Sequence, residues 1–325
     1  MKKLIFPLIC MAFVYSCIAI KPSERINFNA PDSYPEGIAF DSTRNVYYVS
    51  SARTGTIGKV TPEGAYSVLH ADSMLKSTYG MKIHPDGKRL FVCVGDANYS
   101  KFTSLDTRQK MIRLISIDLA SGKRLSDTDL SGLVPGKHFG NDLVFDAKGN
   151  IYMTDSYANV IYKITAEGKA SVFSKSKKYE TKGIGLNGIV YHPAGFLLVD
   201  NSNTGQIYKV DIEAPDNVQK VEVDQYFLGA DGLLMSGDDK LTVVVNGGND
   251  KIFQLKTDDN FKSAWLSGTT LAADRFTYPS TAVRNGKDIW VMNAKFSELV
   301  DSNAVPPKYF AIQLAKIKPL PKMKK

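Results

Sequence analysis

The 325-residue sequence has few of the residues that cross-link chains or bind soft metals. It contains three cysteines and four histidines. Only Cys93 lies beyond Cys17, so no disulfide can form within the body of the chain. Cys93 stands in the apolar run RLFVCV, where we expect a buried, unreactive thiol rather than a nucleophile.

A concentrated positive charge is also missing from the body of the chain. The net charge of +8 lies mainly at the two ends, in Lys2, Lys3, Lys316, Lys318, Lys322, Lys324 and Lys325. A nearly neutral body offers no basic face for nucleic acid, so we expect no nucleic-acid partner. We interpret the tail (317–325) as a solvated terminus, with contact to an anionic surface as the alternative.

The first 17 residues predict a secretory leader. The stretch MKKLIFPLICMAFVYSC has a basic start and an apolar run that is too short to span a membrane comfortably. A serine directly before Cys17 resembles a bacterial lipoprotein signal, in which Cys17 would become the lipidated N-terminus; plain secretion is the alternative. We therefore expect an exported protein, periplasmic or extracellular, whose only link to a membrane would be a lipid on Cys17.

Helical periodicity is nearly absent, and short apolar strands alternate with turns instead. The phrases PEGIAF, YGMKI, GNDLVF, LNGIVY, ADGLLM and PSTAV each open one unit of strands. Successive phrases are 43 to 48 residues apart, except for a step of 62 residues between the second and third. Six four-stranded units of this length predict an all-β fold, a six-bladed β-propeller. A β-sandwich would not explain the repeated phrase.

We expect one closed domain over residues 24–316. The sixth unit supplies only three strands, and RINFNA (25–30) is predicted to provide the fourth and to close the ring. The phrases that open the units should share one face with the long segments 97–109, 126–139, 174–185, 266–278 and 295–307. Long loops over a channel mouth are where a pocket is expected.

Four of these phrases carry an acid or an amide directly before the strand: Glu36, Asn141, Asn187 and Asp231. Their side chains are hard oxygen ligands, which suit Ca²⁺, whereas Zn²⁺ prefers His or Cys. Two carboxylates would also balance a divalent charge and would repel each other without it. The alternative is that each side chain only caps the start of its strand.

These phrases, PEG at 35–37, GND at 140–142, LNG at 186–188 and ADG at 230–232, resemble the gluconolactonase and regucalcin (senescence marker protein) family. The resemblance implies a Ca²⁺ site, with Mg²⁺ or Mn²⁺ possible, formed by Glu36, Asn141, Asn187 and Asp231. It also implies hydrolysis of a small-molecule lactone or ester. In that reaction Asp231 would act as general base or nucleophile.

Three residues near this set suggest a pocket that differs from those of sugar lactonases. Phe139 stands where gluconolactonase-type members often have an arginine, which suggests a more apolar substrate. His138 is a candidate proton shuttle, with simple solvent exposure as the alternative. Tyr79 occupies the equivalent position in the second unit and would either line the pocket or plug the channel.

Other polar and aromatic positions are interpreted as structural. Asp155 and Asp200 are expected to cap turns, as is Asn246 in its Asn-Gly-Gly sequence. Aromatic side chains at packing positions on strands are expected in the core: Tyr48, Tyr152, Tyr162, Tyr208 and Trp290.

The alternative function is a non-catalytic propeller. The stretches NIYMTDSYANVIYKI and FLLVDNSNTGQIYKV also resemble NHL repeats, which bind a ligand or protein partner on the loop face. A propeller similar to strictosidine synthase, without metal, is a third and weaker reading.

Overall fold

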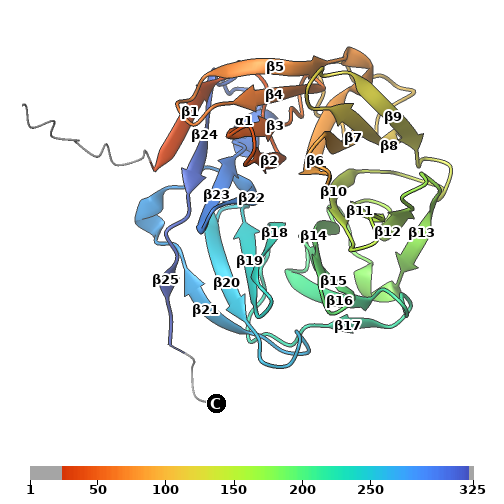
Figure 1. Cartoon of the computed structure of the whole chain (residues 1–325), viewed down its shortest axis with the longest axis vertical. Coiled ribbons are helices and arrows are strands. Elements are labelled where there is room, and N and C mark those ends of the chain that lie inside the picture. Colours follow the sequence, from red (N-terminus) through yellow and green to blue (C-terminus); the bar gives the residue numbers. More distant parts are fainter. Residues whose placement is uncertain (1–23, 322–325) are drawn as a thin grey trace, which may run out of the picture.

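Six antiparallel sheets are arranged in a ring around a common axis (Figure 1). This computed structural model describes residues 24–321. The predicted leader (1–17), Cys17 and the last four residues of the tail lie outside that range. Within it, no helix is long and apolar enough to cross a membrane. The all-β six-bladed propeller predicted from the repeated phrases is confirmed.

Each of the first three blades is a meander of four strands in chain order. Blade 1 contains β2 (Ile38–Asp41), β3 (Val46–Val49), β4 (Thr56–Val60) and β5 (Tyr66–Ala71). Blade 2 contains β6 (Ser77–Ile83), β7 (Arg89–Gly95), β8 (Ile112–Asp118) and β9 (Arg124–Asp129). Blade 3 contains β10 (Gly140–Phe145), β11 (Ile151–Asp155), β12 (Val160–Ile164) and β13 (Ala170–Lys175).

Blades 4 to 6 repeat the pattern, with additions at the two chain ends. Blade 4 contains β14 (Leu186–His192), β15 (Phe196–Asn201), β16 (Gln206–Asp211) and β17 (Val218–Lys220). Blade 5 contains β18 (Ala230–Gly237), β19 (Lys240–Val245), β20 (Lys251–Lys256), β21 (Trp265–Thr269) and β25 (Lys318–Pro319). Blade 6 contains β22 (Pro279–Asn285), β23 (Asp288–Asn293), β24 (Tyr309–Leu314) and β1 (Arg25–Asn29).

The two ends of the described chain both pair with a blade edge. The N-terminal strand β1 lies antiparallel to β24, from Arg25 opposite Gln313 to Asn29 opposite Tyr309, which confirms the predicted closure. The start of the tail, interpreted from the sequence as a solvated terminus, also joins a blade. Lys318 and Pro319 pair with β21, because this strand would otherwise leave its outer edge open to solvent.

Helical structure is limited to single turns in the loops. They are the 3-10 turns Ser73–Leu75, Lys177–Tyr179 and Ala272–Asp274, and α1 (Phe296–Val300). The core consists of strand side chains packed between neighbouring blades, and it includes the five aromatics expected there: Tyr48, Tyr152, Tyr162, Tyr208 and Trp290. Cys93 is fully buried, and burial raises the pKa of its thiol, as expected of an unreactive cysteine.

The repeated phrase has a structural cause. In blades 2 to 6 the innermost strand shifts register against its neighbour at the phrase, as at Leu186/Ile189, where a bulge re-aims the side chains. The glycine after the acid or amide permits close approach of the next blade. A Cβ at Gly37 would lie 2.1 Å from the carbonyl oxygen of Tyr79, and one at Gly188 would lie 2.7 Å from that of Asp231.

Candidate functional site

The four side chains predicted as ligands are buried at the starts of four innermost strands. Glu36 is 4% exposed, Asn141 2%, Asn187 4% and Asp231 9%. Glu36 and Asp231 interact electrostatically across the channel, and the side chain of Asn187 is hydrogen-bonded to Asp231. These residues come from blades 1, 4 and 5, so the channel brings together positions far apart in the sequence. We call the four residues the anchor ring.

Three oxygen atoms of the anchor ring are buried without a hydrogen-bond donor. Glu36 Oε2, Asn141 Oδ1 and Asn187 Oδ1 have no partner among the described residues. The Asn141 amide is nevertheless oriented, because its Nδ2 donates to Ser156 Oγ at 3.0 Å. A buried acceptor without a partner is costly, and a cation would satisfy all three at once. The donor set therefore fits a hard divalent ion.

The same conclusion follows from the acids. Burial raises the pKa of Glu36 well above its usual value; Asp231 and Asp142 raise it further, and Lys82 opposes them. Burial raises the pKa of Asp231 to about 7, although hydrogen bonds from Asn187 and Asn246 lower it. Over residues 24–321, no group of three or more His, Cys, Asp or Glu side chains is placed to hold a metal. Only two members of the anchor ring, Glu36 and Asp231, are of these residue types, and its other two members are amides.

One lysine lies near these acids. Lys82 Nζ lies 3.2 Å from Asp142 Oδ1, and this carboxylate is 4% exposed. Asp142 follows Asn141 directly, at the position that a glycine holds in other blades. Because the charge of Lys82 is paired with Asp142, Glu36 and Asp231 have no lysine of their own, and one divalent cation would balance their charged forms.

Asp155 and Asp200 differ from each other although both are fully buried. Asp155 Oδ1 accepts hydrogen bonds from the backbone amides of Phe139, Tyr157 and Ala158, as expected of a turn cap. Asp200 caps no turn, so that prediction is wrong. Neither Asp200 oxygen accepts a hydrogen bond from a described side chain, and burial together with Asp231 raises the pKa of Asp200 well above its usual value.

His138 is buried rather than solvent-exposed, with 2% of its surface accessible. Its Nδ1 lies 2.7 Å from Asp155 Oδ2, and the Tyr162 hydroxyl donates to the same oxygen at 3.1 Å. Burial is the largest single cause and lowers the pKa of His138. The hydrogen bond and charge of Asp155, together with backbone hydrogen bonds at Val134 and Ser131, outweigh it, so the net shift is upward. These contacts hold His138 between strands of blade 3, and no described contact joins it to the anchor ring.

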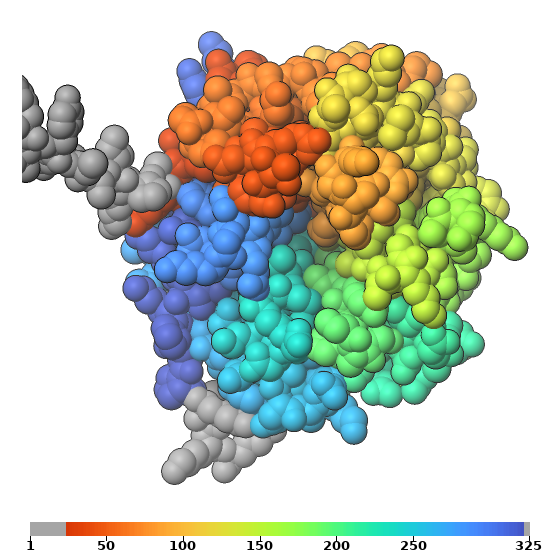
Figure 2. All heavy atoms as spheres, in the orientation of Figure 1, coloured from red at the N-terminus to blue at the C-terminus, as the bar shows by residue number. Residues whose placement is uncertain are grey.

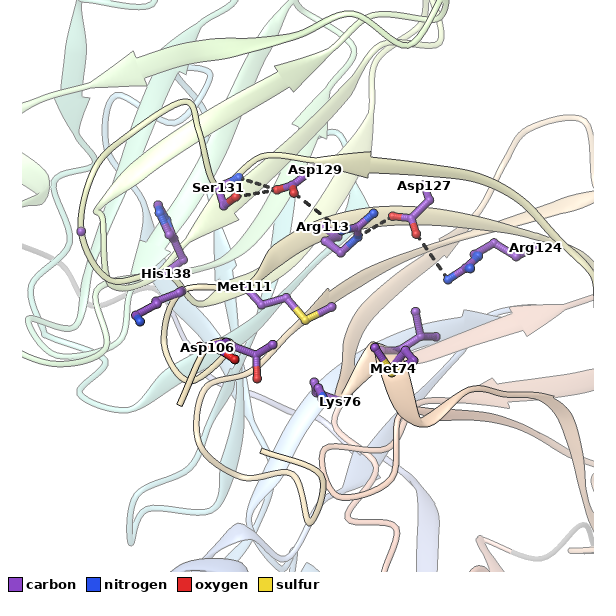
Figure 3. Close-up of a pocket in the computed structure, with 14 residues that line it drawn as sticks. Met74, Lys76, Asp106, Met111, Arg113, Arg124, Asp127, Asp129, Ser131 and His138 are labelled. Carbon is purple, nitrogen blue, oxygen red and sulfur yellow. Dashed lines mark hydrogen bonds and ion pairs between the residues drawn. The ribbon is translucent and has the colours of Figure 1, made fainter. Parts of the chain in front are cut away.

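His138 also lines a cavity of ≈ 620 Å³ beside blade 2 (Figure 3). The arginines in this cavity are already paired. Arg113 Nε lies 2.7 Å from Asp127 Oδ1, and Arg124 Nη1 lies 3.3 Å from Asp127 Oδ2. With its arginines engaged in this way, the cavity offers weak attraction for a charged ligand.

Aromatic rings gather around the anchor ring on the loop side. The ring of Tyr79, fully buried, meets Phe139 edge-on with centroids 4.8 Å apart. Phe139 is 4% exposed, and it also contacts Tyr99 and Tyr157. The structure therefore joins Tyr79 and Phe139, two of the predicted pocket residues, in one aromatic cluster, while the third, His138, turns toward Asp155.

The channel also contains a cavity of ≈ 340 Å³ lined by residues of all six innermost strands. Its walls are mainly apolar, with side chains such as Ile83, Val190 and Leu234, and Lys82 reaches into it. Figure 2 looks along the ring axis and shows a hollow at the centre of the ring.

Sequence reasoning missed several residues near the anchor ring. Asn246 donates its Nδ2 to Asp231 Oδ2 at 2.5 Å, although its Asn-Gly-Gly context had suggested only a turn. Lys82, Tyr99 and Tyr278 also interact with the acids of the site. Lys82 lies in the repeated phrase, three residues after Tyr79, and could have been found by register. Tyr99 and Tyr278 come from loops whose course no repeat predicts.

The comparisons with known proteins establish the fold. No family model matches the chain, and no curated protein matches it. Among solved structures, the allergen Mala s 1 of Malassezia sympodialis is similar with a TM-score of 0.71 and 16% identity, over 90% of this chain and 96% of that one. A luciferin-regenerating enzyme gives a TM-score of 0.59 and 15% identity, over 90% and 97%.

Virginiamycin B lyase of Staphylococcus aureus gives a TM-score of 0.57 and 15% identity, over 89% of this chain and 98% of that one. At such identities the likeness extends to the fold alone. The protein is a six-bladed β-propeller whose structural neighbours include enzymes, and its similarity to the gluconolactonase and regucalcin family stays a prediction from the four phrases.

Proposed function

We propose that this protein is a divalent-cation-dependent hydrolase of a lactone or ester. The observation that carries the proposal is the group of three unpartnered, buried oxygens on Glu36, Asn141 and Asn187, beside the buried carboxylate of Asp231. Oxygen donors alone, with two carboxylates among them, favour Ca²⁺, and Mg²⁺ or Mn²⁺ are the alternatives. When bound, such a cation would polarise the carbonyl group of the substrate.

Asp231 is the residue we assign to the reaction itself. Asn246 holds its Oδ2 at 2.5 Å and the Asn187 side chain makes a second hydrogen bond, so the carboxylate is fixed in orientation. A fixed carboxylate at the channel can take a proton from water or attack a carbonyl carbon directly. A lactone or ester is activated enough for one positioned carboxylate and one electrophilic group to suffice.

Two further points support an enzyme. Structural neighbours with 15% identity carry the names of enzymes, a luciferin-regenerating enzyme and a lyase, so this ring architecture accommodates catalysis. Export through the 1–17 leader, with or without a lipid on Cys17, belongs to the same proposal and places the substrate outside the cytoplasm.

The test combines metal analysis with a panel of lactones and aryl esters. We expect about one divalent cation per chain, and turnover that chelation removes and Ca²⁺ restores. Asp231→Asn should abolish turnover and keep the fold, whereas Asp216→Asn, an exposed acid on the β16–β17 loop, should change neither. A protein that binds no cation and opens no substrate would overturn the proposal and favour a ligand-binding propeller similar to NHL proteins.

A further inference from the structure

Five aromatic side chains from separate segments pack in a continuous row near Asp231. They are Tyr99, Phe139, Tyr157, Tyr278 and Phe296, and we call them the aromatic wall. Ring centroids are 6.3 Å apart for Tyr99 and Phe139, and 5.5 Å apart for Phe139 and Tyr157. The row continues through Phe296, 5.7 Å from Tyr99 and 5.8 Å from Tyr278.

The wall lies at the edge of the core, and its tyrosines are only partly buried. Tyr99, Tyr157 and Tyr278 keep intermediate exposure, while Phe139 and Phe296 behind them are 4% and 8% exposed. The phenylalanines thus support a row of tyrosines that keeps partial contact with solvent. Tyrosine faces with this exposure are typical of surfaces that bind ligands.

Tyr278 is held in a strained backbone conformation. Its φ is 51°, a left-handed value that is a genuine outlier for a bulky side chain. Two hydrogen bonds hold it there, from the Tyr278 amide to Asp250 Oδ2 at 3.2 Å and from the Ala294 amide to the Tyr278 carbonyl at 3.0 Å. The equivalent residues Tyr34 and Gly229 are left-handed too, so this conformation belongs to the blade repeat, and a glycine at 278 would remove the strain.

The wall lies next to the residue assigned to the reaction. The Asp231 carboxylate acts on the phenol groups of both Tyr99 and Tyr278. Burial, then Tyr157 and then Asp231 raise the pKa of Tyr99 to about 12. Both phenols can donate hydrogen bonds. The β19–β20 loop connects Asp231 with the aromatic wall. Asn246 at the start of this loop binds Asp231, and Asp250 at its end binds Tyr278.

The loops that carry the wall also expose aliphatic side chains. Leu105, 76% exposed, lies on the same loop as Tyr99, and Val300 and Val305, 68% and 85% exposed, lie on the loop of Phe296. These side chains are the apolar part of loops that also carry charged residues, such as Lys101 and Glu298.

We propose that the aromatic wall is a subsite for a flat, uncharged aromatic group of the substrate, which it holds beside Asp231. The substrate class is then an aryl-substituted or benzo-fused lactone or ester, and this inference rests on the proposed function. The ring of the ligand would stack on the accessible parts of the tyrosines, and the phenols of Tyr99 and Tyr278 would donate to oxygens of the ester group.

The test uses two uncleaved probes, so that it does not depend on hydrolysis. Binding of a benzo-fused six-membered lactam and of the plain six-membered lactam is measured by calorimetry, on the full chain with Ca²⁺ present. We expect the benzo-fused lactam to bind roughly 3–10-fold more tightly, the range expected for one aromatic contact. Equal affinity for the two lactams would overturn the subsite even if the protein hydrolyses esters.

The variants separate a binding role from a structural one. Tyr278→Gly removes the ring and relieves the strain, so it should lose the preference for the benzo-fused lactam without lowering the melting temperature. Tyr99→Leu should weaken the preference independently, which keeps the test decisive if the first variant folds poorly. Tyr309→Leu, at a tyrosine that is 59% exposed on β24, is the matched control and should keep the preference. If the preference for the benzo-fused lactam survives in both Tyr278→Gly and Tyr99→Leu, the inference is contradicted. If the preference disappears in these variants but the protein cleaves no ester, the subsite stands and only the proposed hydrolase is refuted.

Discussion

Asn246 donates its side-chain amide to Asp231 across 2.5 Å, and the same amide nitrogen lies 3.2 Å from the carbonyl oxygen of Pro279. The bond joins the inner strand β18 to the end of β19 and, through Pro279, to blade 6. One asparagine therefore fixes the carboxylate of blade 5 against the neighbouring blade. Asn246 touches Asp231 rather than the expected position of the substrate, so we regard it as a positioning residue.

Replacing Asn246 with leucine should raise the pKa of Asp231 above about 7, because the donor that favours the carboxylate is lost. A hydrogen bond to a charged group contributes about 1.5–3 kcal/mol, which corresponds to roughly one to two pH units. The measurement is the pH dependence of kcat/KM, in which the acidic limb should move to higher pH by that amount. Asn203→Leu, at an exposed asparagine, is the control. An unchanged limb with lower activity would show that Asn246 acts only on structure.

The cation-free protein should become less stable as pH rises from about 4 to about 7. Both Glu36 and Asp231 have a raised pKa in the folded state, from ordinary values of 4.5 and 3.8. In this range the folded protein retains protons that the unfolded chain has released, so the free energy of unfolding falls with increasing pH. Above it, the Asp231 carboxyl is charged and its penalty is complete.

Melting temperatures in chelator and in excess Ca²⁺ test this sign across pH 5 to 8, roughly the window in which the shifted acids titrate. We expect a decline of several degrees in chelator and a much smaller one with Ca²⁺, since the cation favours the charged acids. Asp231→Asn should flatten the decline in chelator. A melting temperature that is flat or rises with pH in chelator would contradict the burial of these two charges.

Gly188→Ala should destabilise the ring by about 1–3 kcal/mol, the usual cost of forcing atoms into a packed site. Its Cβ would lie 2.7 Å from both the Asp231 carbonyl oxygen and the Leu233 amide, which are backbone atoms that cannot rotate away. Gly132→Ala is the matched control, because nothing lies within 4 Å of a Cβ there. Equal melting temperatures for the two variants would refute the close approach of blades 4 and 5.

The sequence predicted the ring well because its cause is local and repeated. The glycine of PEG, LNG and ADG is required where neighbouring blades approach, so the phrase recurs in each blade that has the contact. The same register placed Glu36, Asn141, Asn187 and Asp231 at equivalent positions. Loops carry no such repeat, and Tyr99 and Tyr278 reach Asp231 from segments far apart in the chain, so their place could not be deduced.

Register also explains the wrong interpretation of Asp200. The sequence LVDNS looks like the MTDS of blade 3, but the strand pairing aligns Asp200 with Thr154 and Asn201 with Asp155. The turn-capping position is therefore Asn201, whose Oδ1 accepts from the Thr204 amide at 3.1 Å. A shift of one residue moves a side chain from the turn to the interior.

Asp200→Asn should preserve the fold and stabilise the protein increasingly as pH rises. Thr154, at the equivalent place, donates its hydroxyl to the Asn187 carbonyl of the next blade at 2.7 Å. A protonated Asp200 can donate its proton toward the Asp231 carbonyl, because a Cβ at Gly188 would lie 2.8 Å from Asp200 Oδ2 and 2.7 Å from that carbonyl oxygen. Since the folded state raises the pKa of Asp200, ionisation costs stability at higher pH, and the neutral amide avoids that cost.

Asp200 is either a protonated acid or a further ligand of the cation. Melting curves of Asp200→Asn and of the original chain, both in chelator, decide between the two. A difference in melting temperature that grows from pH 5 to 8, about the range in which a raised carboxyl ionises, supports the protonated acid. Ca²⁺ affinity should then stay within about threefold, because a neutral side chain contributes little charge to the site. If instead Asp200→Asn weakens Ca²⁺ binding by tenfold or more, roughly 1.4 kcal/mol, Asp200 is ionised and belongs with Glu36 and Asp231.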